Sequence, residues 1–90
     1  MKCVVLYQPA DGVSTKAPAH FAAHVAHYEP FVAAGTLLMI GTFGDVQAQG
    51  SMAIFTSREA AEEFVRNDPF VVNGVVREVE LRDWDEVLVP

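Results

Sequence analysis

The sequence contains only one cysteine, Cys3, so no disulfide can form within the chain. A single thiol in an apolar stretch is typical of proteins from a reducing compartment. Long apolar runs are missing as well, because the first one stops at Gln8-Pro9 and is too short for a signal peptide or a membrane span. From these absences we expect a cytoplasmic protein.

Basic residues are few and do not cluster: six Lys and Arg stand against twelve Asp and Glu, for a formal net charge of −6. An acidic chain without a basic patch repels polyanions, so neither nucleic acid nor an anionic membrane is expected as a partner. Glycine-rich phosphate loops and dinucleotide fingerprints are also missing, and we expect no cofactor.

Hydrophobic residues nevertheless make up 51% of the 90 residues, which is typical of a globular protein. A chain of this length is expected to form one domain, residues 1–90. The core of so small a domain supplies little surplus stability, which favours association into an oligomer.

Apolar patterns and turn residues predict elements in the order β-α-β-β-α-β, followed by a tail. The expected strands are residues 2–8, 36–43, 51–56 and 75–84, and the expected helices are residues 17–35 and 58–67. Residues 85–90 are expected to add a short edge strand, either to this sheet or to a partner's. This order predicts a ferredoxin-like α+β fold, in which a four-stranded antiparallel sheet carries two helices on one face. The other face is expected to be buried against a second copy in a homodimer, because strands 2–8 and 36–43 are apolar on both sides.

The expected first helix carries all the histidines of the chain on one stripe, at His20, His24 and His27. A second stripe, about 100° round the helix, is predicted to face the core and contains Phe21, Val25, Tyr28 and Val32. Any function is expected where the histidine stripe meets the rest of the fold.

Hydroxyl and proline residues suggest where the first helix begins and bends. Ser14 or Thr15 is expected to cap it, and Pro18 suits its first turn. Pro30 lies inside the helix and is expected either to kink it near Ala26 or to divide it into two pieces.

Glycine and serine mark the later boundaries. Residues 44–50 read as a hairpin connection, and Gly41 inside its strand predicts a bulge or a close approach by another group. Ser57 is expected to cap the second helix without a capping box.

Several short motifs follow one another along this chain. They are His24 followed by Gly35, the segment LLMIGTFGD, the return strand GSMAIF, Asp68-Pro69-Phe70 followed by Gly74, and a final strand that ends in Trp84. Over essentially the whole chain this pattern resembles the YCII (YciI-like) family of small α+β domains that form dimeric barrels. The resemblance implies a dimeric α/β barrel with a site for a small molecule, and one relative resembles a dehydrochlorinase acting on a halogenated, hydroxylated aromatic.

The resemblance also implies that His24 lies near Asp68, where the two would act as a catalytic proton-transfer pair. Tyr7, Ser51 and Gly41 are the further residues predicted to contact the substrate. A purely structural alternative is that Asp68 caps the turn after the second helix while His24 packs above it.

A metal site is the other alternative for the histidine stripe. His20 and His24 have the spacing that places two imidazoles on one helix face. No glutamate accompanies them as in HExxH, and a carboxylate would have to come from Asp11, Asp45 or Asp68 through folding. We expect no metal, with His20 and His27 at the edge of the core.

The function predicted from these residues is a lyase- or isomerase-like enzyme that removes a proton from an activated aromatic or carbonyl compound without a cofactor. The competing hypothesis is a non-catalytic dimer that binds a metabolite or serves another enzyme. A third is a cofactor-free monooxygenase of the same barrel class.

Overall fold

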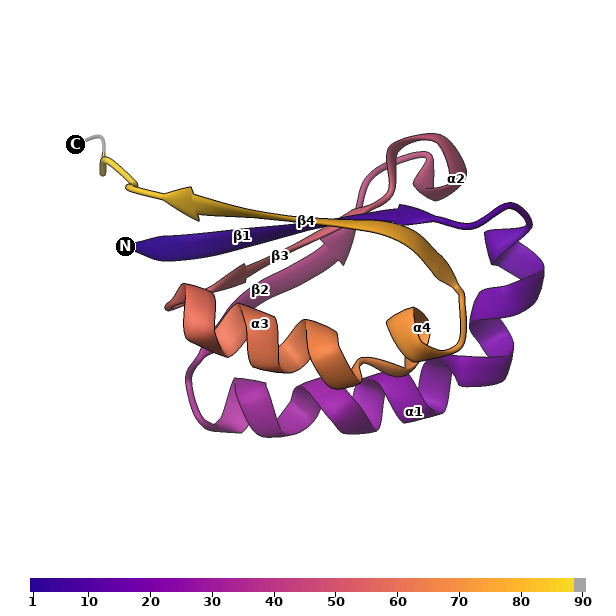
Figure 1. Ribbon diagram of the computed structural model, residues 1–90, viewed down its shortest axis with the longest axis horizontal. Helices are drawn as coiled ribbons and strands as arrows, with labels where there is room; N and C mark the ends of the chain where they lie inside the picture. The colour runs from indigo at the N-terminus through magenta and orange to yellow at the C-terminus, as the bar shows by residue number, and fades with distance from the viewer. Residues whose placement is uncertain (89–90) are drawn as a thin grey trace.

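The protein has two layers, an antiparallel sheet and a layer of helices that covers one of its faces (Figure 1). A computed structural model describes residues 1–88. Its elements are β1 (Lys2–Pro9), α1 (Val13–Ala33), β2 (Leu37–Thr42), α2 (Val46–Gln49), β3 (Ser51–Phe55), α3 (Arg58–Asn67), α4 (Pro69–Val72) and β4 (Val76–Trp84). Over the described residues the sheet has four strands in the order β2-β3-β1-β4, which confirms the ferredoxin-like α+β fold.

Strand β1 lies at the centre of the sheet and pairs antiparallel with both β3 and β4. Its residues alternate strictly, so that Cys3, Val5 and Tyr7 are buried beneath the helices while their neighbours are half-buried on the opposite face. The core around these side chains contains Leu37, Ala53, Phe55, Ala61 and Phe64. The core therefore lies between the sheet and the helices, next to the second half of α1, where Tyr28 and Phe31 pack against it.

Helix α1 begins earlier than predicted, at Val13, and neither Ser14 nor Thr15 caps it. Gly12 occupies the N-cap position with φ 74°, and the first N–H of the helix donates to the side chain of Gln47 in α2 at 2.9 Å. The same Gln47 amide donates to the carbonyl of Ala10 at 3.0 Å. Gln47, which is distant in sequence, thus satisfies a backbone N–H that a local capping residue would otherwise satisfy.

The prolines of α1 both lie inside the helix. Pro18 falls well inside it and not in its first turn as predicted. Of the two outcomes predicted for Pro30, division of the helix is wrong, because α1 continues from Val13 to Ala33. The chain beyond Pro30 is still helical, since the N–H of Ala34 donates to the Pro30 carbonyl at 2.9 Å.

The buried residue in the middle of α1 belongs to the histidine stripe, whereas the predicted apolar stripe faces the core only in part, where Tyr28 packs against it. His24 is 7% exposed, whereas Phe21 is 56% and Val32 is 51% exposed. His24 and His27 turn inward because they find hydrogen-bond partners on the turn after α3 and on α3 itself, which offsets the cost of burying imidazole.

Two short helices were not predicted. Residues 44–50 form more than a hairpin loop, because Asp45 accepts a hydrogen bond from the N–H of Ala48 at 3.2 Å and caps α2. Helix α4 follows α3 directly. The prediction for α3 itself is confirmed in full, with Ser57 accepting from the N–H of Ala60 at 3.2 Å.

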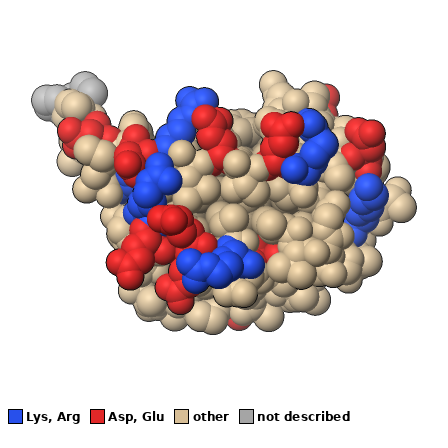
Figure 2. All heavy atoms as spheres, in the orientation of Figure 1, with Lys and Arg blue, Asp and Glu red and all other residues tan. Residues whose placement is uncertain are grey.

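The outer face of the sheet is uncovered in Figure 1 and is apolar over β2. Only Leu37 of that strand is buried, while Met39 is 67% exposed. Charged side chains lie mainly on α3 and β4, and Figure 2 shows acidic and basic residues side by side over these elements. Arg58 of α3 forms an ion pair with Asp83 of β4 at 2.8 Å. β2 and β4 form opposite edges of the sheet, and an exposed apolar strand such as β2 is typical of an association surface.

The tail adds no edge strand to the chain's own sheet over residues 85–88, which have no regular structure. Residues 89–90, which belonged to the same prediction, lie outside the described residues. An ion pair between Lys2 and Glu86 fastens this part of the tail to β1. None of the helices in residues 1–88 combines the length and the apolarity that crossing a membrane requires.

Gly50 joins α2 to β3 at a point where the backbone passes against β1. Its φ of 78° and ψ of −150° lie in a region reserved for glycine. A Cβ atom at this position would overlap the carbonyl oxygen of Tyr7. Gly35 has a similar φ of 75°, but nothing lies within 4 Å of the corresponding Cβ position.

These two glycines give a matched test of the packing between β1 and β3. We expect Gly35→Ala to lower the free energy of unfolding by about 1–2 kcal/mol, the cost of a left-handed backbone alone. Gly50→Ala adds a backbone clash and should cost about 4 kcal/mol or more. Urea unfolding of the two variants measures the difference, and equal costs would show that the contact with Tyr7 is looser than the structure indicates.

Candidate active site

The turn between α3 and α4 places a carboxylate inside the protein. Asp68 ends α3 and caps α4, where its side chain accepts from the N–H of Phe70 at 3.0 Å and Pro69 takes the first helical position. The residue is 0% exposed. A buried carboxylate is costly unless donors surround it, so its other contacts decide whether it can be charged.

Three donors satisfy the carboxylate of Asp68. Besides the N–H of Phe70, Nδ1 of His24 lies 2.7 Å from Oδ1, and the hydroxyl of Tyr7 donates to Oδ2 at 2.7 Å. Burial raises the pKa of Asp68, but the hydrogen bonds from His24, Tyr7 and the Phe70 N–H outweigh burial and hold this pKa below its usual value. Asp68 is therefore ionised at neutral pH.

The charge of Asp68 determines which nitrogen of His24 carries the proton. A carboxylate only accepts hydrogen bonds, so Nδ1 of His24 must donate to it. In neutral imidazole the remaining nitrogen, Nε2, is then an unprotonated acceptor. Nε2 has no hydrogen-bond partner among the described residues. Since every fully buried side-chain N or O atom of these residues has a partner, Nε2 is not fully buried. It is exposed where His24 lines the neighbouring cavity.

Aromatic rings hold the His24 imidazole in place. It stacks on Phe70, with ring centroids 4.0 Å apart and planes 7° from parallel, and meets the edge of Tyr28 at 5.4 Å. Because Phe70 belongs to the same turn as Asp68, one short segment provides both the hydrogen bond and the stacking surface for the histidine. The imidazole is thereby oriented before any ligand binds.

Tyr7 reaches this group from the centre of the sheet. Burial and, after it, the charge of Asp68 raise the pKa of Tyr7 well above its ordinary value. Its phenol therefore remains protonated and serves as a hydrogen-bond donor. Tyr7 thus links β1 to the turn between α3 and α4 and helps to keep Asp68 ionised.

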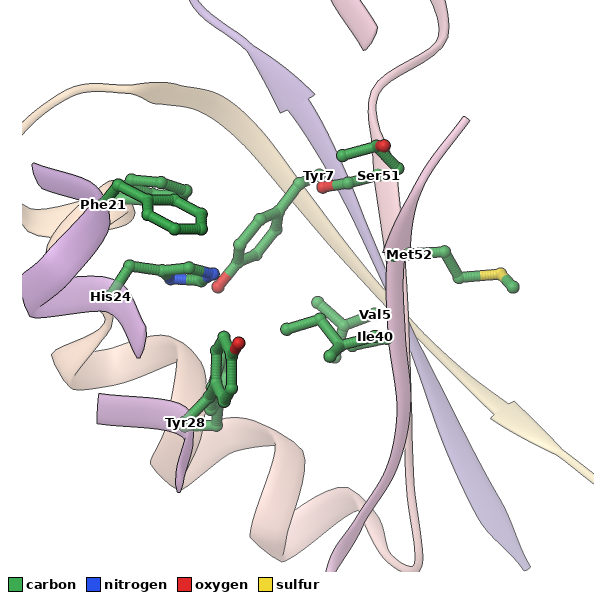
Figure 3. A pocket seen from close by; sticks show the side chains of 13 residues that line it. Val5, Tyr7, Phe21, His24, Tyr28, Ile40, Ser51 and Met52 are labelled. Atoms are coloured by element: carbon green, nitrogen blue, oxygen red, sulfur yellow. The ribbon is translucent and has the colours of Figure 1, made fainter. Parts of the chain in front are cut away.

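A cavity of about 200 Å³ opens beside His24 between the helices and the sheet (Figure 3). Figure 3 shows the side chains of His24, Tyr7 and Tyr28 pointing toward one another, whereas Met52 points away on the other side of the sheet. The lining consists of Val5, Tyr7, Phe21, His24, Tyr28, Ile40, Gly41, Thr42, Ser51, Met52, Ala53, Phe64 and Phe70. His24 is the only imidazole in this set, in otherwise apolar surroundings with a few hydroxyl groups.

The structure thus brings together the residues singled out from the sequence. His24, Asp68 and Tyr7 form one hydrogen-bonded chain, and Ser51 and Gly41 lie in the wall of the cavity that His24 borders. Asp68 also caps α4, so the catalytic hypothesis and the structural alternative describe the same side chain.

Sequence reasoning missed three aromatic residues of the site, Phe21, Tyr28 and Phe70. Phe21 and Tyr28 were assigned to the core stripe of α1, although both line the cavity. Phe70 was noticed as part of the DPF motif without a role. The signal for its stacking on His24 was its place two residues after a capping aspartate, which puts it at the start of a helix beside that carboxylate.

The remaining histidines do not join His24 in a cluster. Nε2 of His27 lies 2.8 Å from the carbonyl oxygen of Phe64, to which it donates. Within residues 1–88 no group of three or more His, Cys, Asp or Glu side chains is placed to hold a metal ion. The stripe of α1 contributes one imidazole to the cavity and a second to the packing of α1 on α3.

Comparison with known sequences identifies the domain. The family described as the YCII-related domain matches residues 1–85, which is nearly the whole chain. A comparison with curated proteins finds no significant match.

Solved structures of three proteins share the fold. The dehydrochlorinase TftG of Burkholderia phenoliruptrix AC1100, which acts on 5-chloro-2-hydroxyhydroquinone and was solved with 2,5-dihydroxybenzoquinone, is 24% identical over 97% of this chain and 96% of that one, with a TM-score of 0.77. MhuD, solved with manganese protoporphyrin IX, is 13% identical over 99% and 96%, with a TM-score of 0.53. The Arabidopsis thaliana protein At3g17210 is 23% identical over 99% and 97%, with a TM-score of 0.50. These similarities confirm the fold of the dimeric α/β-barrel group.

The ionised state of Asp68 predicts a specific loss of stability in acid. Because the folded pKa of Asp68 is lowered, its contribution to stability is fully present above about pH 4, the ordinary pKa of Asp, and disappears as the pH falls through the lower folded value. Asp68→Asn should cost about 1–3 kcal/mol at pH 7. The free-energy difference between this variant and the wild type should shrink below pH 4.

Urea unfolding between pH 7 and pH 2.5 measures this difference. Asp83→Asn is the matched control, because Asp83 has a 51% exposed side chain in a surface ion pair with Arg58 and should matter little at any pH. A gap between wild type and Asp68→Asn that stays constant down to pH 2.5 would show that Asp68 is not held ionised.

Proposed function

The chain belongs to the YCII-related domain family, and on that premise we propose that it is an enzyme in which His24 and Asp68 transfer a proton to and from a small molecule in the adjoining cavity. The observation that carries this proposal is the orientation of the imidazole. Oδ1 of Asp68 lies 2.7 Å from Nδ1, from which it accepts a hydrogen bond, and the lone pair of Nε2 is left for a ligand. A carboxylate-oriented histidine is a common general base near neutral pH.

The proposed reaction uses each member of the hydrogen-bonded chain. Nε2 of His24 removes a proton from a hydroxyl group or an activated C–H bond of the substrate. The imidazolium that forms is stabilised by the charge of Asp68, whose ionised state depends on the hydrogen bond from Tyr7. Nε2 then returns the proton to another atom of the substrate or to a leaving group, which makes the chemistry lyase- or isomerase-like.

An activated aromatic or carbonyl compound is the substrate class that suits this cavity. An apolar cavity of about 150 Å³ holds a benzene ring, so the 200 Å³ beside His24 accommodates one substituted ring. The dehydrochlorinase of similar fold acts on a hydroxylated, chlorinated single ring, which supports the same size and chemistry here. Ser51 and Thr42 supply hydroxyl groups in the wall that can bind ring substituents.

The central test is loss of turnover on removal of the imidazole. We expect the wild-type protein to convert at least one member of a panel of hydroxylated and halogenated single-ring aromatics, and His24→Ala to lower kcat/KM for it by about 10²–10⁴-fold. His20→Ala, on the same helix and outside the cavity lining, should change it less than twofold. Product formation followed by chromatography and absorbance measures both rates.

Two outcomes would contradict this proposal. If His24→Ala retains wild-type turnover, Nε2 is not the base. If no member of the panel is converted although ring compounds bind in the cavity, the protein is the non-catalytic metabolite-binding or accessory protein that its apolar lining also suits. Oxygen consumption during turnover would instead indicate the monooxygenase.

A homodimer through the open sheet face completes the proposed assembly. The outer face joins the exposed Met39 of β2 to the half-buried Met52 of β3 and Val4 and Leu6 of β1, and exposed apolar faces of this extent favour association. A sheet-to-sheet dimer would bury this face and leave the cavity, which lies on the helix side, in each protomer.

Charge introduced on this face should separate the protomers. We expect Met39→Glu to shift the protein from dimer to monomer in light scattering, because a buried carboxylate without a partner opposes association. Val72→Glu is the control, since Val72 is 66% exposed on α4 in the helix layer. A wild-type protein that is monomeric at micromolar concentration, or a Met39→Glu variant that remains a dimer, would refute this interface.

A further inference from the structure

A second and larger cavity adjoins the one beside His24. Its volume is about 540 Å³, and it lies between the N-terminal half of α1, the short helix α2 and the adjacent ends of the strands. Its lining consists of Tyr7, Pro9, Val13, Ser14, Ala17, Pro18, Phe21, Thr42, Val46, Gly50, Ser51, Phe70, Val75 and Val76. The mechanism proposed above makes no use of this space.

The two cavities share a border to which five elements contribute. Tyr7 of β1, Phe21 of α1, Thr42 of β2, Ser51 of β3 and Phe70 of α4 line both of them. In Figure 3, Phe21 lies beside His24 at this border. Phe21 is 56% exposed, so packing does not fix its ring and it can turn aside for a ligand that extends from one cavity into the other.

The second cavity has the chemistry of a site for an uncharged group. Its lining contains no acidic, basic or histidine side chain, and its polar side chains are hydroxyl groups of Ser14, Thr42, Ser51 and Tyr7. Burying a charge among such groups would be costly, whereas apolar surface gains about 25 cal/mol for each Å² removed from water. An alkyl or aryl group therefore suits this space best.

Volume indicates how the two cavities divide a ligand. The 200 Å³ beside His24 fits a single ring, because about 150 Å³ suffices for benzene. A single ring would leave the adjoining 540 Å³ unfilled. Ligand sites are usually filled by a ligand whose surface they enclose for the most part. Filling both cavities here requires a molecule longer than one ring.

We propose that the second cavity binds an apolar substituent of the substrate, so that the substrate class is a ring with an acidic hydroxyl or carbonyl group at His24 and an uncharged alkyl or aryl chain directed toward α2. This inference rests on the proposed function for the position of the ring. It adds a specificity site, built by α1, α2 and the ends of the strands, that selects substrates by the length of their substituent.

Binding of a homologous series tests the proposal without requiring turnover. The probes are 4-alkylphenols from methyl to hexyl, used below the concentration at which they aggregate, with affinities from titration calorimetry. Each methylene that enters the second cavity should tighten binding about fourfold, which corresponds to 0.8 kcal/mol. A series whose affinity does not rise with chain length would overturn the proposal.

Filling the second cavity should remove this dependence. Ala17 lines only the larger cavity, so Ala17→Phe places a ring where the alkyl chain would lie and should flatten the rise to less than twofold over the whole series. Ala22→Phe is the matched control, because Ala22 is exposed on the same helix and lines neither cavity. Val46→Trp fills the cavity from α2 and replaces Ala17→Phe if circular dichroism shows that variant to be unfolded.

The outcomes separate this inference from the proposed function. A rise with chain length that survives in Ala22→Phe and in His24→Ala, and disappears in the filled variants, supports the second cavity even if no phenol is converted. Turnover of short substrates together with a flat series supports the His24 mechanism and refutes the second cavity. A rise that persists in both filled variants shows that the chains bind elsewhere, and it also refutes the proposal.

Discussion

The structure depends on one buried charge, the carboxylate of Asp68. It lies at the point where α3 ends and α4 begins, and its three hydrogen bonds come from β1, α1 and the backbone of α4. A carboxylate that is 0% exposed is tolerated only because all three donors are present. Because these hydrogen bonds join the sheet to the helices, they also fix the positions of the two layers on either side of the cavity.

This requirement explains why the site and the core cannot be separated. His24 turns toward the core because Asp68 needs a hydrogen-bond donor there. Tyr7 is buried in the core and also donates a hydrogen bond to the other carboxylate oxygen. Phe70 stacks on the imidazole because the cap of α4 places it there. The proton-transfer function that we propose uses groups whose positions are already needed for burying the charge.

Sequence reasoning predicted what depends on local signals. The sequence of strands and long helices along the chain, the bounds of α3 and its cap at Ser57 follow from hydrophobic period and capping chemistry. The proximity of His24 to Asp68 came from family resemblance. The start of α1 could not be predicted, because its first N–H is satisfied by Gln47, which is 34 residues away. The inward orientation of His24 and His27 could not be predicted for the same reason. Their hydrogen-bond partners, on the turn after α3 and on α3, come close to α1 only after folding.

The most direct test of this account is the protonation state of His24 read by ¹⁵N NMR of the imidazole at neutral pH. The account predicts that Nδ1 carries the proton and Nε2 does not, and that Asp68→Asn, which can donate as well as accept, abolishes this preference. A proton on Nε2 in the wild-type protein, or a preference for Nδ1 that survives Asp68→Asn, would show that Asp68 does not orient the imidazole. Either result would contradict the proton-transfer pair.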